Sequence, residues 1–157
     1  MIDFAAVLKL IHVLSGAVLF GTGLGIAFFM VWATRTRSAP TVAAVARIVV
    51  VADFVFTATA VVIQPLTGLW LIRLQGYGLT EPWLLATYGL YGLTGLCWLP
   101  VVWIQQRMAR VAAAAASSGA NLPPAYDRLY WLWFVLGWPA FAAVIAIYAL
   151  MLFKPEF

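Results

Sequence analysis

The chain contains 157 residues, of which 66% are hydrophobic and 9% are charged, and its mean hydropathy is +1.02. A soluble domain carries about 25% charged residues, so this composition excludes a water-facing globule and predicts an integral membrane protein. The lone Cys97 excludes an intrachain disulfide and a metal site built only from cysteines. The formal net charge of +4 comes from residues at segment ends rather than in a run, which argues for membrane topology and against nucleic-acid binding.

Four apolar stretches are long enough to cross a bilayer, which takes about 20 residues. They cover residues 4–34, 45–74, 82–104 and 129–153. Because lipid cannot satisfy exposed backbone groups and nothing in the chain has the pattern of barrel strands, all four are predicted to be helices. The sequence thus predicts an all-α integral membrane four-helix bundle, with residues 1–157 as a single transmembrane domain. The third helix is expected to continue beyond its span and to unravel at 117–119.

The placement of basic residues predicts the orientation of the bundle. The first and third connections carry three arginines each, whereas the second connection and the C-terminal tail carry one basic residue each: Arg35, Arg37, Arg47; Arg107, Arg110, Arg128; Arg73; Lys154. Cytoplasmic connections are the basic ones. We therefore expect both termini on the outer, periplasmic side of a bacterial inner membrane. Because Asp3 stands where a signal peptide has its basic region, we expect the first stretch to be a span rather than a cleaved signal.

The first span contains the only histidine, His12, with Lys9 one turn closer to water on the same face. One interpretation is a neutral imidazole that is hydrogen-bonded to a neighbouring helix while Lys9 snorkels outward. The other is an axial haem ligand, with Lys9 paired to a propionate. One histidine cannot supply both axial ligands, so the second would be Met, Tyr, Lys, water or the same histidine of a dimer partner.

Small residues form a ridge at helical spacing on the first span and recur on the third. They are Ala17, Gly21 and Gly25, and then Gly89, Gly92 and Gly95. Such ridges allow helices to approach closely in membranes, so we expect helix packing there rather than nucleotide binding.

Polar residues follow one stripe of the second span, at spacings of four, three, four and three: Asp53, Thr57, Ala60, Gln64 and Thr67. The stripe is expected to face the bundle, because a carboxylate in lipid is costly. It is either a structural hydrogen-bond network, with Asp53 paired to an Arg or to Gln105 or Gln106, or a proton path or cofactor contact. Pro65 frees the carbonyl of residue 61, so a spare acceptor is expected there.

Three tyrosines, Tyr88, Tyr91 and Tyr148, are expected near the level of His12. They are either packing residues or walls for a flat apolar cofactor between helices. No paired carboxylates, nucleophile elbow or phosphate loop is present, which argues against hydrolases and kinases.

Five ordered motifs give the chain a family resemblance. They are "LKLIHVLSGAVLFGTGLGIAFFM", "VADFVFTATAVVIQPLTGLWL", "GLCWLPVVWIQQRM", "GWPAF" and "LMLFKPEF". Together they resemble the predicted integral membrane proteins grouped as domain of unknown function 2269, over essentially the whole chain. The resemblance implies a four-helix membrane protein.

A more distant similarity is to the HemJ-type protoporphyrinogen oxidases, small membrane proteins that bind haem b. It is carried by Lys9 and His12, by the second-span Pro65, Gly68 and Trp70, and by the terminal Lys154 and Pro155. The resemblance implies that His12 is a haem ligand. The chain departs from the pattern after Trp83, where Thr87 stands in place of the family lysine, which puts oxidase activity in doubt.

Three functions follow as hypotheses. The first is a haem b protein of electron transfer or of haem or porphyrin handling, with cofactor-binding residues Lys9, His12, Gln64, Tyr88 and Tyr91 and with His12 as the metal ligand. The second is a cofactor-free accessory or assembly subunit that binds a second copy or a partner membrane subunit through its small-residue ridges. The third is a small proton-coupled transporter that uses Asp53 and Gln64. All three share the lipid bilayer as a partner.

Overall fold

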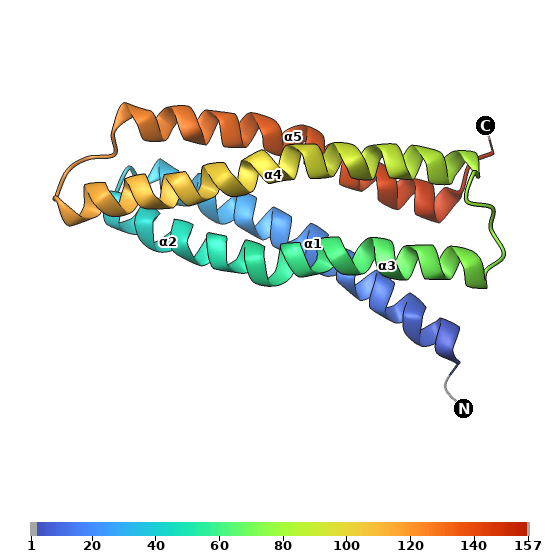
Figure 1. Ribbon diagram of the computed structural model, residues 1–157. Helices are drawn as coiled ribbons and strands as arrows, with labels where there is room; N and C mark the ends of the chain where they lie inside the picture. The colour runs from blue at the N-terminus through green and yellow to red at the C-terminus, as the bar shows by residue number, and fades with distance from the viewer. Residues whose placement is uncertain (1–2, 157) are drawn as a thin grey trace.

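The computed structural model describes residues 3–156 and is helical apart from short connections. Its elements are α1 (Phe4–Arg35), α2 (Ala39–Ala52), the π-helix η1 (Asp53–Thr57), α3 (Ala58–Leu74), α4 (Pro82–Ser117) and α5 (Pro124–Phe153). Because α2, η1 and α3 follow one another without a break, the chain forms four long rods joined by short loops (Figure 1). Each rod is long and apolar enough to cross a membrane. The prediction of an all-α four-helix membrane bundle is confirmed.

A capping residue places the start of α2 earlier than expected. The side chain of Ser38 accepts a hydrogen bond from the Thr41 amide, and a proline follows in the first turn, so α2 begins at Ala39 rather than at residue 45. Arg47 therefore lies inside α2, and its assignment to the first connection is wrong. The helix α5 begins at Pro124, five residues before the predicted span, with a proline in its first turn as suits a helix start. The connection between α4 and α5 begins with Ser118 and Gly119, and Gly119 has a φ of +65°, as expected for a residue that ends a helix.

Charged residues bracket all four rods at one common spacing. The pairs are Lys9 and Arg35, Arg47 and Arg73, Glu81 and Arg107, and Arg128 and Lys154, each 26 positions apart. At 1.5 Å per residue this is about 39 Å, which matches a hydrocarbon core of about 30 Å with part of both headgroup layers. Asp53 is the only Asp, Glu, Lys or Arg inside these intervals, and His12 is the only histidine. The two residues are therefore the natural places to look for function.

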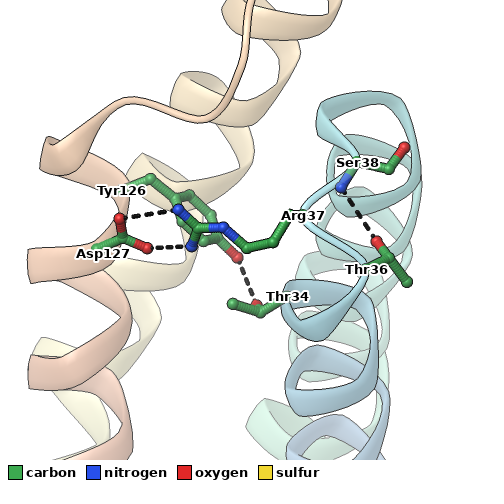
Figure 2. A network of polar contacts seen from close by, with 6 residues as sticks. All are labelled: Thr34, Thr36, Arg37, Ser38, Tyr126 and Asp127. Carbon is green, nitrogen blue, oxygen red and sulfur yellow. Dashed lines mark hydrogen bonds and ion pairs between the residues drawn. The ribbon is translucent and has the colours of Figure 1, made fainter.

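The main core lies near the end of the bundle that carries the α1–α2 and α4–α5 connections, which we call the two-loop end. Met30, Val42, Met108 and Tyr126 are almost completely buried there and come from four different rods. The Tyr126 hydroxyl lies 2.8 Å from Thr34 Oγ1 (Figure 2).

An ion pair closes the two-loop end outside this core. The Arg37 guanidinium donates two hydrogen bonds to the Asp127 carboxylate, so that the α1–α2 connection is tied to the first turn of α5 (Figure 2). The neighbouring carboxylate raises the pKa of Arg37 above its usual value. Arg37 has a φ of +54°, in the left-handed region that a non-glycine residue adopts at a cost.

The opposite end, which we call the terminus end, is held differently. There α1 diverges from α4 and α5 and keeps its contact with α3 (Figure 1). The C-terminal Lys154 donates a hydrogen bond of 2.6 Å to the Tyr77 hydroxyl, and its ammonium group also lies over the ring of Trp83. The start of α1 and the end of α5 both lie at this end of the bundle, as four spans require (Figure 1). That this end faces the periplasm stays a prediction.

Candidate functional site

His12 lies on α1 where this helix contacts α3. Its Nδ1 is 2.8 Å from Thr67 Oγ1. The Thr67 hydroxyl has a single proton, which it donates to the carbonyl of Ile63 at 2.7 Å. The threonine hydroxyl therefore has no proton left for His12, and the proton in the contact between the two side chains belongs to His12 Nδ1, which donates to Thr67 Oγ1. This assignment leaves Nε2 with its lone pair available, the tautomer that a metal-ligating histidine needs.

A glutamine fixes the backbone beneath the imidazole. Gln64 Nε2 donates to the carbonyl of His12 at 2.7 Å and to Ser15 Oγ at 2.6 Å, and the Ser15 hydroxyl donates to the same carbonyl at 3.1 Å. Together with Thr67, these residues form what we call the His12 cluster (His12, Ser15, Gln64 and Thr67). The cluster ties α1 to α3 through side chains from both helices, so the position of the imidazole is set by two helices at once.

Two glycines let neighbouring groups approach the His12 cluster. A Cβ at Gly68 would lie 3.3 Å from His12 Cε1, and a Cβ at Gly16 would lie 2.9 Å from the Tyr148 hydroxyl. Any larger residue at these two positions would displace the imidazole or the tyrosine. Sequence reasoning did not assign either glycine a contact, although Gly68 lies one residue after Thr67 and so flanks the predicted stripe.

The other predicted cofactor residues are less closely gathered. Lys9 is exposed, one turn from His12 toward the terminus end, and Tyr88 on α4 is also exposed. Tyr91 donates a hydrogen bond of 2.5 Å to the carbonyl of Val61 on α3. This is the acceptor that Pro65 was expected to free, and that prediction is confirmed.

Asp53 occupies a second, separate polar position at the start of η1. It is 4% exposed, and Trp98 Nε1 donates to its Oδ1 at 3.3 Å. The expectation that it pairs with an Arg, Gln105 or Gln106 is therefore wrong. Within residues 3–156 its Oδ2 has no hydrogen-bond partner, and the same holds for Thr57 Oγ1 and for Gln105 Oε1. Asp53 lies 11 residues from Gln64 along the rod, or about 16 Å, so the two polar positions are not one site.

The small-residue ridges do not pack against other helices of this chain. A Cβ added at Gly21, Gly89, Gly92 or Gly95 would meet nothing within 4 Å, and one at Gly25 would meet only Phe29 of its own helix. The prediction of close helix approach is wrong for contacts within one copy. The reason is that the ridge on α1 lies on a different face from Ser15, whose side of α1 is the one in contact with α3.

The donor set limits the kinds of metal centre that the described part of the chain offers. Among residues 3–156, no three His, Cys, Asp or Glu side chains are grouped in a way that could hold a metal ion. A protein-coordinated zinc centre needs three or four such ligands. Haem differs in this respect, because its porphyrin supplies four nitrogen ligands and the protein adds only axial ones. A single histidine such as His12 is enough to supply one axial ligand.

The fold and the site define a multi-pass integral membrane protein of four helices, with one oriented histidine near the terminus end. The family model of the predicted integral membrane proteins of DUF2269 matches residues 6–155, and the chain belongs to this family. No curated protein and no solved structure matches the chain.

Proposed function

We propose that the chain is a bacterial inner-membrane haem b protein in which His12 is an axial ligand, and that it serves electron transfer or the handling of haem or porphyrin. The terminus end, and with it His12, faces the periplasm in this proposal. The observation that carries the proposal is the hydrogen bond between His12 Nδ1 and Thr67, which directs the free lone pair to Nε2.

The surroundings of His12 suit a flat apolar ligand. Gly68 lets the imidazole lie close against α3, because a Cβ there would approach His12 Cε1 to 3.3 Å. Lys9 is exposed one turn away, where its ammonium group suits a propionate. Tyr88 and Tyr91 on α4 remain the proposed aromatic walls, and Tyr91 is anchored to α3 through the Val61 carbonyl.

Two members of the His12 cluster then hold different parts of the ligand residue. Thr67 holds the ring and its tautomer, and Gln64 holds the backbone of α1 so that the ring does not rotate away. Haem, when bound, supplies a one-electron redox centre at its iron. We do not extend the proposal to porphyrinogen oxidation. The HemJ resemblance places a lysine at residue 87, whereas the chain has a buried threonine whose hydroxyl donates to the carbonyl of Trp83.

The test is an absorption spectrum of protein purified after expression with haem in excess. We expect a Soret band in the wild type, its loss in His12→Ala, and a weaker band in Thr67→Val. Thr59→Val is the matched control, because Thr59 is exposed and its hydroxyl donates to a carbonyl one turn back in the same manner. A colourless wild-type protein would refute the proposal.

A second candidate function is that of a cofactor-free accessory subunit. It is favoured by the outward position of Ala17 and Gly21: both are exposed, and a Cβ at Gly21 would meet nothing within 4 Å. Small exposed residues at this spacing suit close contact with another membrane helix. We expect Gly21→Cys to form a disulfide between copies in the membrane in a Cys97→Ala background. Val62→Cys is the control, because Val62 is exposed on another rod and belongs to neither ridge. Under this alternative, Gly21→Leu disrupts the complex and His12→Ala has no effect.

A further inference from the structure

A groove on the bundle surface lies between α2 and α4, which run side by side toward the two-loop end (Figure 1). Its volume is about 500 Å³. Arg47 of α2 and Arg110 of α4 line it from opposite helices, and Val50, Val51, Phe54 and Ala109 form most of the remaining lining. The groove therefore has two cations above an apolar floor.

These two arginines differ from most others at the same end of the bundle. Arg37 pairs with Asp127, Arg35 lies over the ring of Trp32, and Arg107 lies over the ring of Trp103. In the described chain, 3–156, no carboxylate neutralises Arg47 or Arg110. The one hydrogen bond of Arg110 runs from Nε to the carbonyl of Gln106 in its own helix, at 3.4 Å.

The depth of the groove matches the boundary between headgroups and hydrocarbon. Arg47 is the charged residue that begins the 26-position interval of its rod, and Phe54 lies seven residues farther along the same helix, about 10 Å deeper. The arginines thus lie at headgroup level while Val51 and Phe54, both exposed, lie at the level of the acyl chains. A soluble anion would make no use of this apolar floor.

We propose that this groove is a binding site for an anionic phospholipid. Arg47 and Arg110 hold the phosphate from two sides through charge-assisted hydrogen bonds, and an acyl chain lies over Val50, Val51 and Phe54. A zwitterionic lipid brings a cationic group beside its phosphate, which two neighbouring arginines repel. The site therefore selects lipids by net headgroup charge.

The experiment is a titration of the purified full chain in detergent, followed by native mass spectrometry of the lipid adducts. The two probes are phosphatidylglycerol and phosphatidylcholine with identical acyl chains. Since each basic residue near a membrane surface adds to the attraction of anionic lipid, we expect the first phosphatidylglycerol to bind about tenfold more tightly than phosphatidylcholine. The double variant R47Q/R110Q is expected to bind both lipids equally.

Three controls separate a built site from general attraction to a basic surface. R107Q removes one charge from the same helix outside the groove, and we expect it to keep the preference for phosphatidylglycerol. V51W fills the exposed floor without changing charge, and we expect it to lose the tight adduct. Millimolar inorganic phosphate should not displace the lipid, because phosphate gains nothing from the apolar floor.

Opposite results would overturn the proposal. They are an undiminished preference in R47Q/R110Q, an equal loss in R107Q, an unchanged adduct in V51W, or displacement by inorganic phosphate. The substituted side chains are exposed, and helical circular dichroism and a monodisperse elution profile establish that each variant is folded before its spectrum is compared.

Discussion

The His12 cluster and the Asp53 position are two polar sites that share one stripe, because Gln64 and Thr67 of the cluster lie on the same rod as Asp53, and the two sites are built in opposite ways. In the His12 cluster, the ring Nδ1, the glutamine amide, the serine hydroxyl and the threonine hydroxyl all have partners within 3.1 Å. At Asp53 one carboxylate oxygen and the neighbouring Thr57 hydroxyl have none among the described residues. In the first site the hydrogen bonds orient one group, the imidazole. In the second, Asp53 Oδ2 and Thr57 Oγ1 have no hydrogen-bond partner among the described residues.

The backbone follows the same division. The His12 cluster lies on regular α-helix, whereas Asp53 begins the π-helix η1. An extra residue in a helical turn shifts the hydrogen-bond ladder, and such turns are frequent at functional sites. Unsatisfied buried groups cost about 1–3 kcal/mol each. We infer that His12 is best tested by measuring what ligand it binds, and Asp53 by measuring how its burial changes the free energy of unfolding.

The largest expected effect comes from breaking the close approach at the His12 cluster. Gly68→Val is expected to lower the free energy of unfolding by about 3 kcal/mol, because the new side chain overlaps the imidazole and separates α1 from α3. Reversible unfolding in bicelles measures the change. Gly89→Val is the matched control, because a Cβ there meets nothing within 4 Å. Equal stability of the two variants would show that the contact between Gly68 and His12 does not hold α1 against α3.

Asp53 is expected to respond in the opposite direction. Asp53→Leu removes a buried carboxylate that has one partner, so we expect the free energy of unfolding to rise by about 2 kcal/mol. A fall in stability would mean that the carboxylate makes an interaction that outweighs its burial cost, and the contrast between the two sites would then be lost.

If Asp53 carries protons, Asp53→Asn abolishes proton flux into liposomes at little cost in stability. Flux equal to wild type counts against a transporter.

A smaller effect is expected at Gln64. Gln64→Leu removes two hydrogen bonds between α1 and α3, and such bonds within membranes average about 0.6 kcal/mol each. We therefore expect a loss of about 1 kcal/mol, measured by the same unfolding assay. Gln106→Leu is the control, because among the described residues only the backbone carbonyl of Gln106 has a hydrogen bond to a side chain, and that donor, Arg110, is in the same helix. Thr67→Val in the Gln64→Leu background is expected to add a further loss, since the two residues hold different atoms of His12.

Much of the fold could be predicted from the sequence, because lipid leaves helices as the only solution for long apolar runs. Helix starts were misplaced where capping residues such as Ser38 extend a helix beyond its apolar run. The partner of Asp53 was misassigned because the sequence does not show which side chain of α4 reaches its carboxylate, and the indole of Trp98 does so. The spacing of the polar residues predicts that they share one side of the second span, but it does not show which neighbouring helix packs against that side. Gly21 and Gly16 differ by only five positions, yet only Gly16 lies against other helices.

The smallest expected effect lies between the two sites, at the carbonyl of Val61. Pro65 has no amide proton, so this carbonyl loses its helical partner and accepts from Tyr91 instead. Tyr91→Phe is expected to cost about 0.6 kcal/mol in the unfolding assay, and Tyr88→Phe nothing.

The interpretation depends on Pro65, so a double-mutant cycle decides it. In a Pro65→Ala background the restored amide bonds the Val61 carbonyl within the helix, and Tyr91→Phe should then become neutral. An unchanged cost of Tyr91→Phe would show that the tyrosine acts through packing. A nonzero coupling energy between Pro65 and Tyr91 would confirm that the freed carbonyl of Val61 holds α4 to α3 between the His12 cluster and Asp53.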